Sequence, residues 1–406
     1  MSRHLLILMP YPEGEGSAWL YIERVAKDLA DRCVARGDKC TIAFPKIFED
    51  ADKRDNKHTL VARNFYGIDF SDTIENAKWI RQSGITHLYF AEHVAFDWRF
   101  AVYRRYADVG IAVQYHHAGG RTKPYTGLAR TLRAGRRVFT SALADLVICV
   151  SQFVLERVVA VSLVPRTRCV AIYNAVIPEL DVSARQLDAR RDELRNEWGV
   201  ASEEPVVLSG ARASREKGLD TLFMAHDKLC SECGAQNLPL PWVAYAGDGT
   251  EFNELNAFRK SLKHGNRIFM LGRVPNMQRL ILAADISVLA SRCDEAFGLF
   301  AAESMQAGLP VIVTNRGGLP EIIDDGVDGY LINSDDVATL TDRMRTLVAD
   351  PKLRERMGLA GIDKMRTRFG YANMLNQMDS QIQNMKFGSS PQSTLTGASA
   401  KKRERE

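Results

Sequence analysis

Two glutamates, Glu295 and Glu303, stand eight positions apart, separated by a Phe-Gly-Leu turn at residues 297–299. Apolar runs at Ile286–Leu289 and Val311–Val313 flank this segment and are typical of buried parallel strands. The order strand, loop, helix, strand puts Glu295 in a loop at the carboxyl end of a strand, where open α/β sheets bind ligands. A helix N-terminus beside a carboxylate suits a ligand that has an anionic part and a sugar part.

A pair of cations, Arg212 and Lys217, follows the first strand expected in the second half, in the run Ser-Gly-Ala-Arg-Ala-Ser-Arg-Glu-Lys-Gly. Cations at a helix start oppose the helix dipole, so a purely structural surface role is the weaker interpretation. Guanidinium and ammonium groups held in place can stabilise the charge that develops on a departing diphosphate without a metal. The pair therefore predicts phosphate binding.

These segments resemble the donor-binding region of retaining glycosyltransferases of the GT-B fold, family 4, also called glycosyl transferases group 1. The family pattern E-G-F-G-L-x-x-x-E-A-M-A-x-G-x-P-V-I contains the two glutamates, and this chain departs from it at Ala296, Ser304 and Gln306. The cationic run resembles the family's G-R-x-x-x-x-K-G, with Arg212 and Lys217 in the same step. The resemblance covers nearly the whole chain and is weaker in the first half.

The resemblance implies roles for the residues that match. Glu303 would accept hydrogen bonds from both ribose hydroxyls of a nucleotide, and Arg212 and Lys217 would stabilise its leaving diphosphate. The donor sugar would be held by Glu295 and by the backbone N–H groups of Phe297, Gly298 and Leu299. Gly317, Gly318 and Glu321 follow another strand end, where they line the same pocket or simply form a turn.

Glycines and histidines at other strand ends extend this set. Gly247 and Gly249 follow an expected strand, and Phe252 occupies the third position of a dinucleotide fingerprint, which argues against an NAD site. The family has a similar Gly-x-Gly near the base and diphosphate. Gly14 and Gly16 stand where the family's glycine-rich loop approaches the donor or the acceptor, although the family usually shows adjacent glycines.

The first half also ends one strand in His116 and His117. The resemblance assigns a contact with the donor sugar to one of the two, and we favour His116. A single histidine at a strand end is more often structural. Ser151 and Asn174 match two further family strand ends, and both are equally well explained as caps.

Short apolar runs that alternate with longer periodic segments predict βαβ units and a parallel sheet in each half. The expected strands of the first half are His4–Met9, Cys40–Phe44, His87–Ala91, Ala112–Tyr115, Leu146–Val150 and Cys169–Tyr173. Those of the second half are Val206–Leu208, Trp242–Ala246, Ile268–Leu271, Ile286–Leu289, Val311–Val313 and Tyr330–Ile332. The expected fold class is α/β of the GT-B type, with two Rossmann-like, doubly wound parallel-sheet domains facing each other across a cleft.

The domain boundaries follow from composition and from this alternation. We expect an N-terminal acceptor-side domain over residues 1–180, a charged linker over 181–204, and a donor domain over 205–370. By analogy with the family, a terminal helix over 371–386 would cross back to the first domain. The tail over 387–406 is rich in Ser, Thr, Gly and charge, which predicts disorder.

The composition is that of a soluble globular protein, with 46% apolar and 26% charged residues among 406. No apolar run approaches the ~20 residues that span a bilayer, and the apolar start of the chain predicts a buried strand and not a signal peptide. Seven cysteines, an odd number, favour a reducing compartment and hence the cytoplasm. Cys230 and Cys233 lack a second pair for a metal site, so we expect half-buried thiols at a helix end.

Residues 99–137 contain nine Lys or Arg and one Asp. Such a cluster favours an anionic partner, either a phosphate-bearing acceptor or the inner face of an anionic membrane. The helix-like segment 127–144 fits a sheet-covering helix somewhat better than a membrane-surface helix. Because no nucleic-acid motif surrounds the cluster, nucleic acid is not an expected partner. Asp50 and Asp52 spell a D-x-D in a charged run that predicts a solvated loop, so we expect no metal site.

The sequence thus predicts an enzyme that transfers a sugar from a nucleotide-diphosphate donor to a glycan, lipid-linked or small-molecule acceptor, without a cofactor. The resemblance implies a retained anomeric configuration and independence of metals. The sequence shows no well-placed nucleophile that would form a covalent intermediate, which fits a front-face mechanism in which the diphosphate itself helps to deprotonate the acceptor. One alternative is a nucleotide-sugar epimerase of the same architecture, which would isomerise the donor when no acceptor is present. Another is a non-catalytic protein that binds nucleotide sugars without turning them over.

Overall fold

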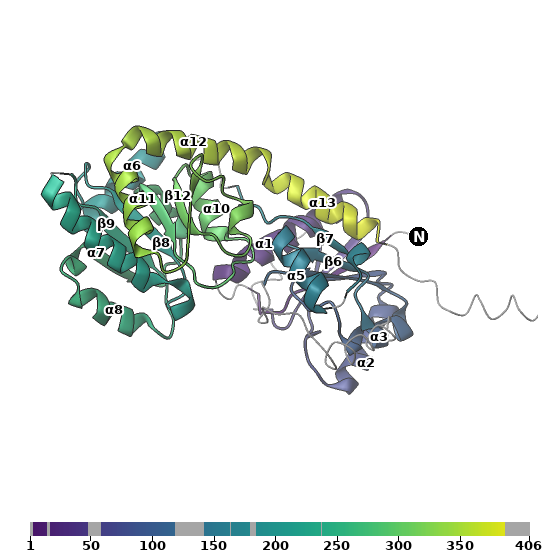
Figure 1. The fold of residues 1–406 in the computed structure, drawn as a ribbon. Coiled ribbons are helices and arrows are strands. Elements are labelled where there is room, and N and C mark those ends of the chain that lie inside the picture. The colour runs from purple at the N-terminus through teal and green to yellow at the C-terminus, as the bar shows by residue number, and fades with distance from the viewer. Residues whose placement is uncertain are drawn as a thin grey trace, which may run out of the picture. The chain divides into compact units, whose positions relative to one another are not determined.

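The computed structural model describes residues 3–13, 17–47, 58–117, 142–162, 164–178, 184–236 and 238–385. These residues form two compact α/β units (Figure 1). The described residues of unit 1 fall within Met1–Cys149, Leu155–Ile172 and Leu375–Glu406, and those of unit 2 within Val150–Val154 and Tyr173–Met374.

Unit 1 is built on a seven-stranded sheet in the order β3-β2-β1-β4-β5-β6-β7, with every strand pair parallel. Its strands are β1 (His4–Leu8), β2 (Lys39–Phe44), β3 (Thr59–Ala62), β4 (His87–Phe90), β5 (Gly110–Tyr115), β6 (Leu146–Cys149) and β7 (Cys169–Ala171). Its helices include α1 (Ser17–Ala35), α2 (Phe70–Gln82) and α3 (Trp98–Ala107), and most of α5 (Gln152–Ser162), whose start up to Val154 belongs to unit 2. The inner strands are buried on both faces, which is why they read as continuous apolar runs.

Unit 2 has a six-stranded parallel sheet in the order β10-β9-β8-β11-β12-β13. Its strands are β8 (Val206–Gly210), β9 (Trp242–Ala246), β10 (Ile268–Gly272), β11 (Ile286–Leu289), β12 (Val311–Thr314) and β13 (Gly329–Ile332). Its helices are α6 (Ala184–Trp198), α7 (Leu219–Gln236), α8 (Phe252–Ser261), α9 (Met277–Ala283), α10 (Leu299–Gln306), α11 (Val337–Ala349) and α12 (Pro351–Thr367).

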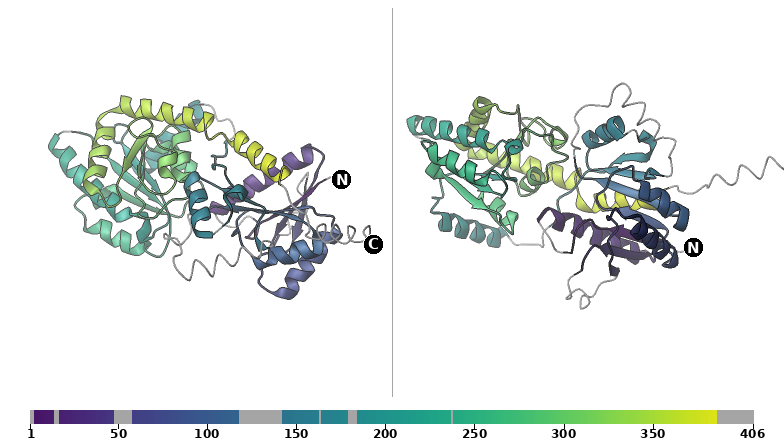
Figure 2. Two further views of the ribbon diagram at one scale, coloured as in Figure 1. Left: turned by 45° about the vertical axis from the view of Figure 1, so that its right-hand side comes forward. Right: turned by 90° about the horizontal axis from the view of Figure 1, so that it is seen from below.

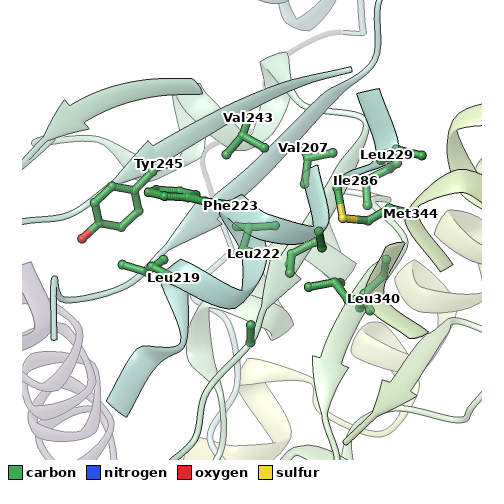
Figure 3. Packing of buried hydrophobic residues seen from close by; sticks show 14 of the residues in the cluster. Val207, Leu219, Leu222, Phe223, Leu229, Val243, Tyr245, Ile286, Leu340 and Met344 are labelled. Carbon is green, nitrogen blue, oxygen red and sulfur yellow. The ribbon is translucent and has the colours of Figure 1, made fainter. Parts of the chain in front are cut away.

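Each face of the sheet in unit 2 packs against its own set of helices, as Figure 2 also shows. On one face Leu222 and Phe223 of α7 pack on strand residues such as Val207 and Val243, with Met344 of α11 nearby (Figure 3). The other face packs against α6 and α9. The helical stripes at 3.6-residue spacing therefore meet an apolar sheet on both sides, which confirms the doubly wound architecture.

The strand order places the two ligand-binding edges. In unit 2 the order reverses between β8 and β11, and in unit 1 it reverses between β1 and β4. Chains leaving neighbouring strands at such a point turn to opposite faces, so the loops there diverge and leave room for a ligand. Functional residues are therefore expected where β8, β11, β1 and β4 end.

The structure differs from the expected elements at β3. Its four residues, Thr-Leu-Val-Ala, form the outer strand of the sheet and are partly or fully exposed. An edge strand this short carries neither a long apolar run nor a clear alternation, so periodicity does not reveal it. All of the strands expected from the sequence are present, and their ends lie within a few residues of the predicted ones.

The charged segment expected to connect the halves carries α6. Arg191 and Arg195 of this helix bond the carboxylate of Asp285, and Leu194 belongs to the core of unit 2. At the other end of the chain, α13 (Tyr371–Gln383) contributes Asp379, which accepts a 2.5 Å hydrogen bond from Arg36 of α1 in unit 1. The tail over 387–406 lies outside the described residues.

The cysteine pair near the middle of the chain is more deeply buried than expected. Cys230 and Cys233 are 1% and 0% exposed and lie within α7, where His226 donates to or accepts from neighbouring polar atoms. Their apolar surroundings make them core residues and not half-buried thiols. All seven cysteines of the chain are free thiols. In the part of the chain that the structure describes, no helix has the length and apolarity to cross a bilayer.

We predict that His226 makes stability depend on pH. Burial lowers the pKa of this fully buried imidazole from 6.5 to about 4. Between these values the unfolded chain binds a proton that the folded chain does not, so the free energy of unfolding should decrease as the pH falls from 6.5 toward 4. Replacing the imidazole in His226→Gln should remove up to about 3 kcal/mol of that decrease.

Urea unfolding at pH 7.5, 6 and 4.5 measures the effect, with each protein referred to its own stability at pH 7.5. A His226→Gln variant with the same pH slope as the parent would contradict the assignment.

Candidate functional site

The reversal point of unit 2 brings a lysine and a glutamate together. Lys217 lies in a short 3₁₀ turn (Arg215–Lys217) after β8, and Glu295 lies in the loop after β11. Because β8 and β11 are neighbours in the sheet, Lys217 Nζ lies 2.6 Å from Glu295 Oε1 although 78 positions separate them. Both side chains are mostly buried, at 16% and 17% exposure.

The hydrogen bonds of the pair leave one carboxylate oxygen of Glu295 open to a ligand. Glu295 Oε1 accepts hydrogen bonds from Lys217 and from the hydroxyl of Ser291, each at 2.6 Å. No described residue donates to Oε2, which is left to accept from a ligand hydroxyl. Burial by itself lowers the pKa of Lys217, but the charge and hydrogen bond of Glu295 outweigh it and raise the pKa. Lys217 is therefore an ammonium ion at neutral pH.

Arg292 holds the two loops in register. Its guanidinium bonds Asp220 at 2.8 Å, Asp335 at 2.5 Å and the carbonyl oxygen of Arg215 at 2.7 Å. Its backbone N–H also donates to the carbonyl oxygen of Glu216 at 2.7 Å. Since Arg215 and Glu216 immediately precede Lys217, this arginine ties the turn that carries the lysine to the loop that carries Glu295.

The N-terminus of α10 supplies backbone donors beside this pair. Gly298 caps the helix with a φ of 97°, a left-handed conformation that glycine adopts readily. The backbone N–H groups of Phe297, Gly298 and Leu299 donate to no described residue, as expected for the open start of a helix. Glu303 lies on the second turn of the same helix and is half-buried. Together these groups form an anion-accepting end with a carboxylate on its flank.

The Phe297 side chain has a structural role. It is 2% exposed, and its ring lies 5.8 Å from that of Phe369 and 6.4 Å from that of Tyr173. The ring therefore anchors the loop in the core, and only the backbone of this residue is available to a ligand.

Two glycines after β12 let another loop pack directly on the backbone of the Glu295 loop. A Cβ on Gly317 would lie 2.2 Å from the carbonyl oxygen of Glu295, and one on Gly318 would lie 2.5 Å from that of Ala296. The Gly318 N–H donates to the Glu295 carbonyl at 2.7 Å, and the Ser151 hydroxyl donates to the Ala296 carbonyl at 2.6 Å. The backbone around Glu295 is thus held from two sides.

Glu321 and Ser151 both act as caps. The carboxylate of Glu321 accepts from the backbone N–H groups of Gln152 and Phe153, at 2.8 and 2.6 Å. The Ser151 hydroxyl accepts from the Val154 N–H at 3.2 Å. These bonds satisfy donors at the start of α5, which agrees with the capping interpretation of Ser151.

Gly247 and Gly249 lie where β9 ends, next to the loop after β8. A Cβ on Gly247 would lie 1.8 Å from the Ala211 carbonyl oxygen, and one on Gly249 would lie 2.5 Å from that of Ala213. No other residue type fits this approach, which keeps the loops after β8 and β9 in contact. Arg212 lies in the loop after β8, where its 68%-exposed side chain pairs with Glu216 at 2.7 Å.

The reversal point of unit 1 gathers a second, smaller set of polar side chains. The Tyr11 hydroxyl donates to Glu92 at 3.2 Å, and His117 contacts the same carboxylate. His116 is partly buried, and burial lowers its pKa to about 4, so its imidazole is neutral. Its Nε2 has no hydrogen-bond partner in the described part of the chain. Gly14, Gly16, Asp50 and Asp52 lie outside the described residues.

Two members of the basic cluster over residues 99–137 are paired with acids in the structure. Arg99 is 6% exposed and lies in an ion pair with Asp97, while Arg104 pairs with Asp145 at 2.7 Å. These two cations are neutralised inside unit 1 and do not contribute to an exposed basic surface. The residues at 121–137 lie outside the described part. Over the described ranges, no group of three or more His, Cys, Asp or Glu is arranged to hold a metal ion.

Several contributors could not be identified from sequence patterns. Ser291 and Arg292 directly follow a strand end, which is the only local signal that they share with Glu295. Glu92 and Tyr11 likewise follow β4 and β1. Their roles depend on which strands are neighbours, and this information is absent from the local pattern.

The chain also matches models of known protein families. Residues 190–364 match the family model described as glycosyl transferases group 1, and residues 22–180 match the model of glycosyltransferase family 4. An N-acetyl-alpha-D-glucosaminyl L-malate synthase of Bacillus anthracis is 28% identical over 187 residues, which are 46% of this chain and 47% of the relative. A D-inositol 3-phosphate glycosyltransferase of Thermobifida fusca is 30% identical over 195 residues, 47% of this chain and 44% of the relative. The matched region thus spans about half the length of these relatives.

Solved structures match over much more of the chain. A glycosyltransferase from Rickettsia africae superposes with a TM-score of 0.77 at 17% identity, covering 95% of this chain and 100% of the other. Anabaena HepE in complex with UDP and glucose superposes with a TM-score of 0.71 at 19% identity, covering 93% and 99%. At this identity the likeness establishes the fold, which is the GT-B fold expected from the sequence.

We predict that Gly247→Ala destabilises the protein by about 2 kcal/mol or more, because the added methyl group would overlap the Ala211 carbonyl oxygen. Gly234→Ala is the matched control: nothing lies within 4 Å of its added methyl group, and helix α7 should gain about 0.5–1 kcal/mol. Urea unfolding of both variants measures the difference. Equal stability of the two would show that the loops after β8 and β9 are not in close contact.

Proposed function

This chain belongs to the glycosyl transferases group 1 of the GT-B fold, and we propose that it transfers a sugar from a nucleotide-diphosphate donor to a hydroxyl-bearing acceptor. One observation carries the proposal. At the reversal point of unit 2, the Lys217 ammonium, the Glu295 carboxylate and the open N–H groups at the start of α10 converge from loops far apart in sequence. These are the groups that a molecule combining an anionic diphosphate with a polyhydroxylated ring requires.

Lys217 is assigned the role of stabilising the leaving diphosphate. Rupture of the bond between the sugar and the diphosphate places negative charge on a phosphate oxygen, and an ammonium ion already held in position stabilises it without reorganisation. The lysine is paired with Glu295, and a phosphate oxygen of the donor can take the place of the carboxylate as its partner. The family resemblance assigns Arg212 to the same anion; its exposed side chain pairs with Glu216 in this structure.

Glu295 and Glu303 are assigned the binding of the uncharged parts of the donor, the sugar and the ribose. Glu295 Oε1 accepts from Lys217 and Ser291 in this structure, and Oε2 would accept from a sugar hydroxyl. Glu303 accepts from the ribose hydroxyls, and the loop containing Gly247 and Gly249 faces the base and diphosphate. The N–H groups at residues 297–299 donate to the sugar or phosphate oxygens. His116 of unit 1 is assigned a contact with the donor sugar on family resemblance alone.

The reaction is proposed to retain the anomeric configuration and to need no metal ion. Both points rest on the family resemblance, and the paired state of Glu295 agrees with a binding role for this carboxylate. The diphosphate itself would then help to deprotonate the acceptor on the same face of the sugar. The proposed acceptor is a glycan, a lipid-linked sugar or a small molecule.

The cytoplasm is the proposed location, supported by the seven free thiols. Contact with an anionic membrane at its inner face is proposed on the basic residues at 121–137, and nucleic acid is not a proposed partner. Calorimetry with a panel of nucleoside diphosphates identifies the donor base. Incubation with the donor alone, followed by a search for a new sugar isomer, distinguishes transfer from epimerisation.

We predict that Lys217→Ala raises the activation free energy by about 2–4 kcal/mol, a loss of roughly 30-fold to 1,000-fold in turnover, since it removes the charge that faces the leaving diphosphate. Steady-state kinetics with a saturating donor measures this, and urea unfolding checks that the fold is kept. Lys228→Ala, which removes an exposed lysine of α7, is the control. Near-normal turnover of Lys217→Ala would refute the role of Lys217.

A second prediction concerns metals. Because cationic side chains replace a divalent ion in the proposed mechanism, turnover should be unchanged after exhaustive treatment with EDTA. Activity that is lost on chelation and restored by Mg²⁺ or Mn²⁺ would contradict it, and would direct attention to Asp50 and Asp52.

A further inference from the structure

Unit 1 carries an exposed apolar patch that the proposed chemistry does not use. It consists of Ile68, Phe70, Val94 and Trp98, which are 81%, 61%, 49% and 42% exposed, and we call it the aromatic platform. The rings of Phe70 and Trp98 are stacked, with centroids 5.8 Å apart and planes 26° from parallel. Single exposed apolar residues are common on protein surfaces, but two large exposed rings stacked on each other mark an interaction site.

The aromatic platform lies at the ligand-binding edge of its sheet. Helix α2 starts at Phe70 after β3, and helix α3 starts at Trp98 after β4. The two helices pack side by side (Figure 1). Because each helix begins where the chain has left a parallel strand, both rings stand at the carboxyl edge of the sheet, where open α/β sheets bind their ligands.

A buried arginine fixes the backbone beneath the platform. Arg99 donates to the carbonyl oxygens of Phe65 and Gly67, at 3.1 and 2.8 Å, and to the carboxylate of Asp97. Asp97 in turn accepts from the Arg99 N–H and caps α3. The segment before α2 is thereby tied to the start of α3, which fixes the backbone next to the two rings. A rigid surface of this kind loses little conformational entropy on binding.

Two exposed acids beside the aromatic platform indicate what kind of ligand it can bind. Asp69 occupies the N-cap position of α2, but its side chain makes no capping hydrogen bond. Asp72, in the first turn of the same helix, accepts a long hydrogen bond from the Ser71 hydroxyl, at 3.5 Å. Both residues are exposed, and neither has a cation partner among the described residues. An acidic rim repels anionic phospholipids and nucleic acids, whereas it accepts hydrogen bonds from neutral hydroxyl groups.

We propose that the aromatic platform binds a neutral carbohydrate portion of the acceptor. The C–H face of a sugar ring packs on the exposed faces and edges of Phe70 and Trp98, and its hydroxyl groups donate to Asp69 and Asp72. Calling this carbohydrate the acceptor rests on the proposed function, while the binding of the carbohydrate does not. The platform thus narrows the acceptor to molecules that present an uncharged sugar.

A printed array of neutral and acidic oligosaccharides, probed with the fluorescently labelled full chain, tests the proposal. The parent protein should bind neutral glycans, and the best of them is then titrated in solution. Trp98→Ala and Phe70→Ala should each weaken that binding at least tenfold, and Trp98→Phe should recover most of it. Leu20→Ala is the matched control, because Leu20 is an exposed apolar residue of unit 1 (51%) outside the platform.

Three results would overturn the proposal: no binding of the parent protein to any neutral glycan, equal binding by Trp98→Ala, or binding to vesicles of phosphatidylethanolamine and phosphatidylglycerol that is lost in Trp98→Ala. Calorimetry with nucleoside diphosphates is run in parallel on the parent protein. Nucleotide binding without glycan binding refutes the platform alone. Glycan binding without nucleotide binding supports the platform and refutes the proposed donor chemistry.

Discussion

Lys217 and Glu295 are largely withdrawn from water, and each can be buried only because the other is present. A buried charge without a partner costs several kcal/mol, so the pair must form whenever the loops after β8 and β11 are in place. The surrounding residues serve this condition: Arg292 ties the lysine turn to the glutamate loop, and Ser291 orients the carboxylate. An anionic ligand can also replace Glu295 as the partner of Lys217, because the ligand and the carboxylate carry charge of the same sign.

The same edge of unit 2 is shaped by close contact between backbones. Gly247, Gly317 and Gly318 let neighbouring loops approach to distances at which any side chain would overlap a carbonyl oxygen. Loops packed in this way have little freedom to move individually, so the open N–H groups at the start of α10 are held at fixed positions. Preorganisation of this kind arises from the absence of side chains as much as from the bonds that are present.

Unit 1 shows how charge in a sequence differs from charge on a surface. Arg99 is the first member of a basic cluster in the sequence, yet in the structure it is a buried brace between Asp97 and two carbonyl oxygens. Its burial removes positive charge from the region and at the same time supports the exposed rings of Phe70 and Trp98. Asp69 and Asp72 at the start of α2 then stand exposed beside these rings, so the count of basic residues in the sequence does not describe this part of the surface.

The sequence by itself determined the alternation of strands and helices, the parallel class of both sheets, and the positions of Glu295, Lys217 and the glycines at strand ends. These properties are local, because periodicity and turn chemistry act over a few residues. Only the tertiary structure decided that β8 lies beside β11, that Lys217 meets Glu295, that β3 completes its sheet, and that Arg99 is buried. Strand order and burial depend on contacts between segments separated by tens of residues, and their free energy is set by packing and desolvation that no short stretch of the chain encodes.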